Sequence, residues 1–455
     1  MWFTSLLTWR TLRMQRVGSS IYQELDALVD SKRESFINLL QELVQCPAPS
    51  WPDVASTEAN AQDVVAAKLE SLSLKALRWI PELGTLRKHP DFKDNPADYV
   101  QRPCISAVLP GSDPTCAAVT LHGHADVVGP GDVDKWLHPP FGAVIEKGKL
   151  YGRGAADARG SLATFLAALE AVVASGTTLK GDVNFVSVAD EEGGGNGTLS
   201  YVDAGLGGDV ALVGEPTGLA LCPGSRGATS FRMRVHGRPA HSGVAYEGEN
   251  AIVKAAAYVQ ALHELQFQLD RESRHPLWET LPVAHAFNIA TIEGGRFVGV
   301  VPDRCDISVI AGCIGGESVS FLKRRVMDTI NRVTAKDPWL QEHPPAISWG
   351  PVHFEPSAIP GAHAVVLILG EAYQGVTGQP PKVHALPAGS DLRHFINAGA
   401  TPGLHFGPGS MRLGHGENEW IDVEEVMTAV KVVARFLLQW TSLPREQALA
   451  PPKGA

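Results

Sequence analysis

The chain has 455 residues, of which 44% are hydrophobic and 19% charged, a composition typical of a globular protein with a sizeable core. Its 39 Lys and Arg against 49 Asp and Glu leave a formal net charge of −10, which argues against sequence-independent binding of nucleic acid. No apolar run approaches the ~20 residues that span a bilayer, so we expect neither nucleic acid nor a membrane among its partners.

The first 20 residues contain three arginines and no acidic residue. Apolar residues precede these arginines, which is the reverse of a secretory signal, so we expect a disordered extension at residues 1–20. An organelle presequence and a later start near Met14 are the alternatives. The six cysteines form no C-x-x-C pair, which indicates core thiols in a cytoplasmic protein.

The first half of the chain alternates helical and strand-like patterns. Apolar residues spaced three to four apart predict helices at 21–45, 55–71 and 161–175, with a proline-rich loop at 81–103. Apolar runs predict buried strands at 117–121, 183–188 and 210–213. This alternation indicates an α/β fold, with a mixed sheet that is flanked by helices and largely parallel at its centre.

The pattern changes near Arg226. Residues 230–236 alternate apolar and polar side chains, which predicts a strand with one wet face. Helices at 250–269 and 318–333, with further strands at 287–292, 304–311 and 346–349, complete a ferredoxin-like α+β unit. The buried pattern then returns, with a helix at 364–373, a strand at 403–406 and a helix at 423–440. We therefore expect one domain built from 21–224 and 345–455, and a second domain inserted at 225–344.

Acidic residues and histidines follow the strand-like runs of the first domain. His124 and Asp126 follow the run at 117–121, and Glu215 follows the run at 210–213. Glu191 and Glu192 follow the run at 183–188, and His415 comes after the strand at 403–406. Because ligands bind outside the carboxyl ends of strands in such sheets, these side chains should meet at one rim. Imidazole and carboxylate without thiolate favour zinc, which cobalt or manganese can replace.

The charges fit two divalent ions. Asp157, Glu192 and Glu215 with one hydroxide would balance two Zn²⁺, while His124 and His415 would bind as neutral imidazoles. Neighbouring residues of an extended segment point in opposite directions, so one of the two adjacent glutamates can bind metal while the other acts as general base. Spacing alone leaves His122 as an alternative ligand to His124.

Five motifs in order resemble those of the M20 metallopeptidase/amidohydrolase family: LHGHADVV at 121–128, LYGRGAAD at 150–157, ADEEGGG at 189–195, GEPT at 214–217 and GHGENE at 414–419. The likeness extends from about residue 21 to 440 and is greatest to the acetylornithine deacetylase/succinyl-diaminopimelate desuccinylase-like group. It implies a zinc-exopeptidase-like catalytic domain with an inserted lid and dimerisation domain.

The resemblance also implies roles for single residues. His124, Asp157 and Glu215 would hold one zinc, and Asp157, Glu192 and His415 the other, which makes two Zn²⁺ per chain. Asp126 would bind the ring of His124 and fix its tautomer. Glu191 would take a proton from the attacking water and give it to the leaving amine.

Three further residues match family positions that contact substrate. His241, in RPAHS at 238–242, would reach the partner's active site in a homodimer joined through the lid and stabilise the oxyanion there. Asn288 would contact the substrate from the lid. Arg393, in GSDLR at 389–393, would bind a substrate carboxylate with its bidentate fork.

One position departs from the family pattern. Many members have an arginine that binds the substrate's α-carboxylate where this chain has Gly312. The substrate can therefore differ from an ordinary N-acyl-α-amino acid, for example a ureido or formamido compound, and restoring Gly312→Arg should improve turnover of N-acetyl amino acids.

The sequence thus predicts a di-zinc hydrolase that cleaves the amide bond of an N-acyl amino acid or a related small N-acyl or N-carbamoyl compound. A dipeptidase or carboxypeptidase with the same metal site is the main alternative, and a catalytically silent binding protein the remote one. A serine hydrolase and an H-E-x-x-H zinc peptidase lack their motifs here.

Overall fold

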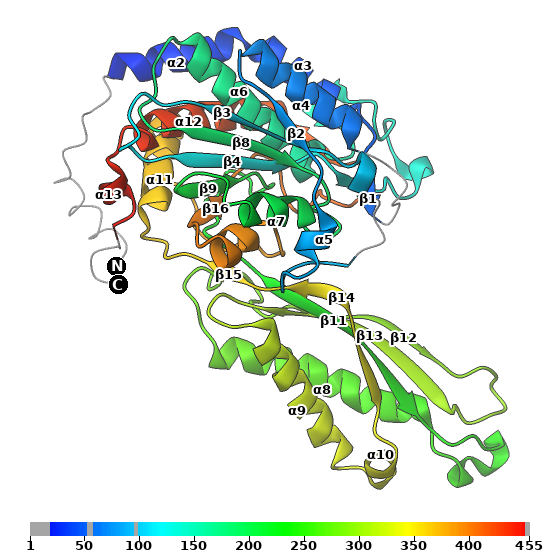
Figure 1. Ribbon diagram of the computed structural model, residues 1–455. Coiled ribbons are helices and arrows are strands. Elements are labelled where there is room, and N and C mark those ends of the chain that lie inside the picture. Colours follow the sequence, from blue (N-terminus) through cyan, green and yellow to red (C-terminus); the bar gives the residue numbers. More distant parts are fainter. Residues whose placement is uncertain (1–18, 52–57, 95–98, 451–455) are drawn as a thin grey trace.

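A computed structural model describes residues 19–51, 58–94 and 99–450. The larger part of the molecule is built around a six-stranded sheet (Figure 1). Its strands lie in the order β16 (Gly403–His405), β9 (Val210–Val213), β4 (Val119–His124), β8 (Val183–Val188), β3 (Cys104–Leu109) and β2 (Leu77–Trp79). The four strands from β16 to β8 are parallel, and β3 and β2 add antiparallel pairs at one side. The prediction of a mixed sheet, parallel at its centre, is confirmed.

Helices cover both faces of this sheet, as expected from strands that are apolar on both sides. Val183 and Phe185 of β8 belong to the core under the larger helical layer, whereas Val186 and Val188 belong to a smaller core on the opposite face. The larger layer contains α2 (Ser19–Ser31), α3 (Arg33–Val44), α4 (Ala59–Ser71), α6 (Gly160–Ala174), α11 (Ala364–Thr377) and α12 (Val423–Trp440). The opposite face carries α7 (Asn196–Asp203) and the helical turn η6 (His394–Ala398).

The N-terminal helix differs from its prediction. Two helices, α2 and α3, replace the single helix expected at 21–45, because the backbone turns at Lys32 (φ −97°, ψ 6°). The apolar spacing continues across this residue, so hydrophobic periodicity gives no sign of the break. The extension expected at residues 1–20 lies outside the described residues except for Ser19 and Ser20, which already belong to α2.

Short elements connect the larger ones. The segment 81–103, expected to be a loop, contains the helical turns α5 (Leu83–Leu86) and η2 (Tyr99–Gln101). Three small sheets pair β17 (Trp420–Asp422) with β7 (Lys149–Tyr151) and β6 (Val144–Glu146), β1 (Pro49–Trp51) with β5 (Val127–Val128), and β10 (Gly224–Ser225) with β15 (Ser357–Ala358). The remaining turns are η3 (Val133–Lys135), η4 (Ala155–Arg159), η5 (Ser242–Glu247) and α13 (Arg445–Ala448).

A second unit, the inserted domain, extends away from the first (Figure 1). It contains β11 (Gly227–His236), α8 (Ala251–Glu272), β12 (Phe287–Gly294), β13 (Arg304–Cys313), α9 (Val319–Thr334), α10 (Pro338–Glu342) and β14 (Ala346–Phe354). Its four strands form an antiparallel sheet in the order β12-β13-β11-β14, with its own apolar core against α8 and α9. The closing strand expected at 346–349 is longer and continues to Phe354.

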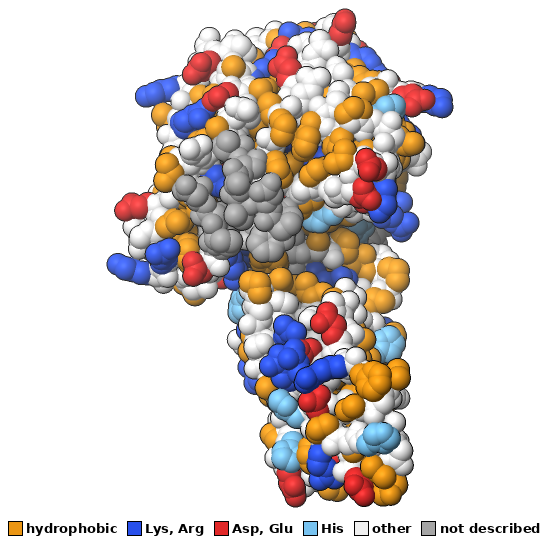
Figure 2. All heavy atoms as spheres, turned by 90° about the vertical axis from the view of Figure 1, so that its right-hand side faces the viewer, with side chains coloured by type: hydrophobic (Ala, Val, Ile, Leu, Met, Phe, Trp, Pro, Cys, Tyr) orange, Lys and Arg blue, Asp and Glu red, His pale blue; other side chains and the backbone are white. Residues whose placement is uncertain are grey.

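The face of this sheet that carries no helix is charged. Arg232, Arg234 and Arg304 surround the buried carboxylate of Asp306, and basic side chains gather on this face in Figure 2. Alternation along β11 explains the difference, because the intervening side chains are buried against the helices. Among the described helices, none is both long and apolar enough to cross a bilayer.

Candidate metal centre

The acidic residues and histidines predicted from the strand ends meet at one rim of the six-stranded sheet. His124 is the last residue of β4, and Glu215 comes just after β9. Glu192 follows β8, and His415 lies between β16 and β17. Asp157 comes from the turn η4, just before the buried helix α6. Apart from His415, which comes from the long loop after β16, each of these residues closely follows the carboxyl end of a strand or precedes the start of a helix.

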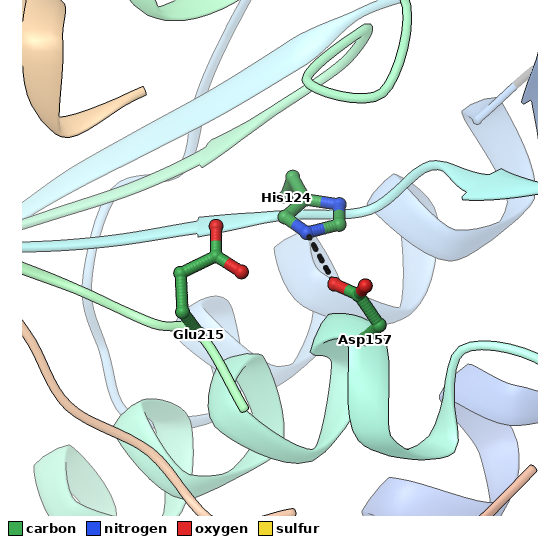
Figure 3. A group of neighbouring side chains, drawn as sticks. All are labelled: His124, Asp157 and Glu215. Carbon is green, nitrogen blue, oxygen red and sulfur yellow. Dashed lines mark ion pairs between the residues drawn. The ribbon is translucent and has the colours of Figure 1, made fainter. Parts of the chain in front are cut away.

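His124, Asp157 and Glu215 form one group of potential ligands, and all three are buried (Figure 3). Their ligand atoms lie within 4.8 Å of one another. His124 Nε2 is 3.7 Å from Asp157 Oδ1, and the Glu215 carboxylate points toward the same space in Figure 3.

Asp157, Glu192 and His415 form the second group. His415 Nε2 lies 3.4 Å from Asp157 Oδ2 and 3.0 Å from Glu192 Oε2. Asp157 therefore turns one oxygen toward each group. The side chain of His415 is 56% exposed, so the second group is the more open one.

The pKa values reflect carboxylates and histidines crowded together. Burial raises the pKa of Glu192 and Glu215, and neighbouring Asp157 raises both further. Hydrogen bonds to Asp157 and Glu192 raise the pKa of His415 to about 11. Burial opposes the charged form of His124, but Asp126 and Asp157 outweigh it and hold its pKa well above the ordinary value.

These residues fit a pair of divalent cations. His124 Nε2 and Glu192 Oε1 are buried and have no hydrogen-bond partner among the described residues. Buried polar atoms nearly always have a partner, so two such atoms within the two groups indicate ligands that await a cation. Imidazole and carboxylate donors suit zinc, cobalt or manganese.

Asp126 supports two sides of the centre. Its carboxylate accepts the main-chain N–H of Glu191 at 3.2 Å and that of Glu192 at 3.1 Å. His124 Nδ1 lies 3.0 Å from the main-chain oxygen of Asp126 and 3.5 Å from its carboxylate. In the neutral ring that a metal ligand requires, a hydrogen bond from Nδ1 to that oxygen leaves Nε2 free of a proton and turned toward the ligand group.

Glu191 and Glu192 lie in a turn after β8, which Gly194 N–H closes on the Asp190 oxygen at 3.1 Å, and not in the extended segment assumed from the sequence. Glu192 belongs to the second ligand group and Glu191 to neither. Burial raises the pKa of Glu191 well above its ordinary value, and the nearby carboxylates of Asp391 and Glu215 raise it further. A carboxyl group with a raised pKa beside a metal group has the properties of a general base and acid.

His122, left open as an alternative to His124, lies in neither ligand group. It is still within β4, where its Nε2 is 2.6 Å from Thr198 Oγ1 and its ring meets Phe395 edge-on at 5.4 Å. The two histidines differ in their position along β4, since only His124 is at the end of the strand, where the ligand group lies.

Arg153 and Glu419, for which the motifs implied no role, hold the backbone around Asp157. Glu419 Oε1 accepts the N–H groups of Ala156 at 2.8 Å and Asp157 at 3.0 Å, and Glu419 Oε2 lies 2.6 Å from Arg153. Arg153 also donates to the main-chain oxygen of His415 at 3.3 Å. Both side chains are buried and lie inside motifs quoted for the family, which was the available signal.

His241 and Asn288 lie in the inserted domain and not in the ligand groups. His241 is exposed, and its Nδ1 accepts the N–H of Gly243 at 3.1 Å. It follows the end of β11 and pairs with Val300, in the loop that joins β12 to β13. Asn288 is exposed on β12, the edge strand of the sheet.

Arg393 lies against the loop that follows Glu192, with only 3% of its surface exposed. Its Nη2 donates to the Gly194 main-chain oxygen at 2.7 Å and its Nη1 to that of Ser390 at 2.8 Å. The guanidinium stacks on Phe354, 4.5 Å from the ring centre. Two of its five N–H groups are thus used within the protein.

Gly312 is buried in β13, and its missing side chain leaves room for Arg226. A Cβ atom at this position would lie 2.8 Å from Arg226 Cδ. Arg226 donates to the main-chain oxygens of Val283 at 2.7 Å and Pro387 at 3.0 Å. The space that an arginine at 312 would need is therefore filled by another arginine.

A cleft of about 490 Å³ begins at the second ligand group. Glu192 and Gly193 form one end, the segment 90–94 forms one wall, and the end of β14 at 351–354 forms the other. Its volume is within the range of small-molecule sites.

Comparisons with known proteins show the family and the fold of the chain. The model of a family described as Peptidase family M20/M25/M40 matches residues 120–439. An N-formyl-4-amino-5-aminomethyl-2-methylpyrimidine deformylase of Halalkalibacterium halodurans is 29% identical, over 93% of this chain and 98% of the relative. The Bacillus subtilis protein of the same name is 26% identical over the same shares. The crystal structure of human carnosine dipeptidase 1 has the same fold, with a TM-score of 0.71, 19% identity, and 93% of this chain and 99% of that one covered.

Proposed function

The chain belongs to peptidase family M20/M25/M40 and is a hydrolase of amides, and on that premise we propose that it cleaves a small N-acyl or N-carbamoyl compound with two zinc ions and a glutamate base. The observation that carries this proposal is the shared residue Asp157, which joins two ligand groups beside Glu191. A site of this kind suits hydrolysis, because it brings a nucleophilic water and an electrophilic carbonyl together.

The metal ligands in the proposal are His124, Asp157 and Glu215 for one ion and Asp157, Glu192 and His415 for the other. Zinc, which cobalt or manganese can replace, would lower the pKa of water toward ~7 and polarise the amide carbonyl. Asp126 keeps His124 in the tautomer that offers Nε2, and it holds the main chain of Glu191 and Glu192.

Glu191 moves the proton in this mechanism. Its carboxylate accepts a proton from the attacking water and then donates it to the nitrogen of the leaving amine. The buried position raises the pKa of Glu191 well above its ordinary value, which makes its carboxylate a stronger base toward the attacking water.

We propose a homodimer joined through the inserted domain, with His241 completing the partner's site. The tip of this domain exposes Phe297 at 69% and Val298 at 94%, beside the edge strand β12. Exposed apolar side chains next to an open strand edge favour association of like surfaces. His241 lies at the same end, where it could donate to the oxyanion of the partner subunit's substrate.

The N-formyl amide is the first substrate class to test. Two curated relatives that match nearly the whole chain are named as deformylases of an N-formyl aminopyrimidine. The arginine beside Gly312 is Arg226, whose two Nη atoms donate to main-chain oxygens of the protein, and this agrees with a substrate other than an N-acyl-α-amino acid. Asn288 and Arg393 remain proposed contacts for the rest of the substrate. The six unpaired cysteines support a cytoplasmic location.

The deciding experiment measures hydrolysis by the zinc-loaded protein over a panel of N-formyl, N-acetyl, N-succinyl and N-carbamoyl amides and dipeptides. Glu191→Ala serves as the blank, because it removes the proposed base and leaves the metal ligands. We expect turnover of one amide class, lost in Glu191→Ala. Turnover of dipeptides alone, or turnover that Glu191→Ala retains, would overturn the proposal.

A further inference from the structure

The cleft beside the metal centre has an aromatic character that the proposed chemistry does not require. Phe92 lies on one wall, and His353 and Phe354 lie on the other. Glu192, a ligand in the second group, marks the end at which the amide would react. A substrate that places its amide there must extend one of its two halves along these rings.

Phe354 is held in place by its surroundings. The guanidinium of Arg393 stacks on its ring at 4.5 Å, and Gly389 packs so closely that a Cβ there would lie 2.9 Å from Phe354 Cδ2. The ring is half-buried, so part of it remains available to the cleft. A fixed ring loses little conformational freedom when another ring stacks on it, which favours binding.

Lys93 is presented to the same cleft from a rigid backbone. Asn196 binds this backbone on both sides, since its Oδ1 accepts the Lys93 N–H at 3.1 Å and its Nδ2 donates to the Lys93 oxygen at 2.8 Å. Among the described residues, the half-buried ammonium of Lys93 makes no hydrogen bond or ion pair. Burial and the nearby cation Arg393 lower the pKa of Lys93 to about 8, as expected for an amine that lacks a bound acceptor.

We propose that this cleft is the amine-side subsite, in which a planar aromatic ring packs against Phe92 and Phe354 and Lys93 donates a hydrogen bond to an acceptor on that ring. The inference rests on the proposed function, because the carbonyl carbon of a formamide carries only a hydrogen and only the amine half can fill the cleft. The acceptor is either a ring nitrogen or a carboxylate on the ring, and a substrate series separates these two.

The test compares kcat/KM for the N-formyl amides of four amines: pyrimidin-5-ylmethylamine, benzylamine, 4-carboxybenzylamine and cyclohexylmethylamine. Phe354→Leu should reduce the values for the three aromatic amides about five- to tenfold and leave the cyclohexyl amide nearly unchanged. Lys93→Met should reduce the pyrimidine or the carboxybenzyl amide about tenfold, but not the benzyl amide, and Lys93→Arg should restore part of the loss.

Matched controls are Phe267→Leu, which changes a phenylalanine that is 42% exposed on α8, and Lys75→Met, which changes an exposed lysine before β2. Neither control substitution should alter the order of the kcat/KM values of the four amides. Equal losses for all four amides in Phe354→Leu, or no selective loss in Lys93→Met, would overturn the subsite.

Binding of pyrimidin-5-ylmethanol to the zinc-loaded protein gives a readout that does not depend on hydrolysis. Saturation-transfer NMR should detect this alcohol on the wild type and much less on Lys93→Met, with cyclohexylmethanol as the comparison. Selective binding without turnover of any amide of the panel would overturn the proposed function and retain the subsite for the ring. Absence of selective binding, together with no selective loss of the carboxybenzyl amide in Lys93→Met, would overturn the subsite.

Discussion

Glu419 Oε1 accepts the main-chain N–H of Asp157 at 3.0 Å, so the carboxylate shared by both ligand groups is positioned by a residue from the far end of the chain. The other oxygen of Glu419 pairs with Arg153 at 2.6 Å, and both partners are buried. A buried ion pair that belongs to neither ligand group therefore supports the candidate metal centre.

Glu419→Gln should lower the free energy of unfolding by about 3 kcal/mol, because it leaves the charge of Arg153 buried without its counter-charge. It should also weaken zinc binding ~10-fold or more, since Asp157 loses its support. Urea unfolding and zinc competition with a chelator measure the two effects. Glu424→Gln is the matched control, because Glu424 is 74% exposed in its pair with Arg33 and should contribute little. Equal effects of the two variants would contradict this account.

Removal of single ligands should distinguish the two groups. His124→Ala and His415→Ala should each retain one zinc per chain, while Asp157→Asn should retain fewer than either, because Asp157 serves both groups. Metal analysis by mass spectrometry after dialysis measures the content without reference to activity. The exposed His263, on α8, provides a control that should keep both ions as His263→Ala. Full zinc content in Asp157→Asn would rule out its shared role.

Gly312→Arg, expected from sequence to improve turnover of N-acetyl amino acids, should instead lower stability. The new side chain would begin 2.8 Å from Arg226 Cδ and 3.2 Å from the Ala286 oxygen. Overpacking of this kind costs about 1–3 kcal/mol. If the loss of stability comes from the clash with the Arg226 side chain, the second substitution Arg226→Ala should restore stability. Thermal unfolding and kcat/KM on N-acetyl amino acids test both variants, and a stable, more active single variant would restore the original expectation.

His285 should make stability depend on pH. It is fully buried between Asp270 at 2.8 Å and Glu317 at 2.9 Å. Burial alone would lower its pKa, but Glu317 and Asp270 outweigh burial and raise it. A raised folded-state pKa stabilises in full below the ordinary value of ~6.5, and the contribution is lost as pH rises through the folded-state pKa.

The free energy of unfolding of the wild type should therefore exceed that of His285→Gln most at pH 5.5, and the gap should narrow toward pH 9. Denaturant unfolding at several pH values measures it. His263→Gln, at an exposed site, should show no such trend. A gap that widens with pH would mean that His285 is neutral when folded.

The candidate ligands could be predicted from the sequence more readily than the residues that position them, and the reason is physical. Candidate ligands such as His124 and Glu215 stand at the ends of apolar runs, where local pattern and chemistry coincide. His122 and His124 both follow from the pattern of β4, and only the depth at which the strand ends separates them. The pair of Arg153 and Glu419 joins residues far apart in the chain, which no local period can reveal.

The strands β2 and β3 were missed for a related reason. They flank a segment rich in proline and charge, and β2 is a three-residue edge strand with exposed side chains, so no buried run marks it. The sheet of the inserted domain was easier to predict from sequence, because β11 alternates buried and more exposed residues over its whole length. Long elements are predicted from their own hydrophobic period. Short edge strands form only by pairing with a strand that is remote in sequence, so their own residues do not reveal them.

The proposed dimer makes one further outcome testable. If His241 acts in the partner's site, His241→Ala and Glu191→Ala are each inactive alone but complement each other when mixed. In a mixed dimer, one site has Glu191 from its own chain and His241 from the partner. Random exchange forms such dimers half of the time with one working site each, so about a quarter of wild-type activity should return.

Mixing the two purified variants under conditions that permit subunit exchange, and following turnover with time, measures this recovery. Mixing two preparations of Glu191→Ala is the control and should stay inactive. No recovery, with exchange verified by differently tagged chains, would mean that His241 serves its own chain or neither. Sedimentation of the untreated protein as a monomer would remove the basis for action across subunits.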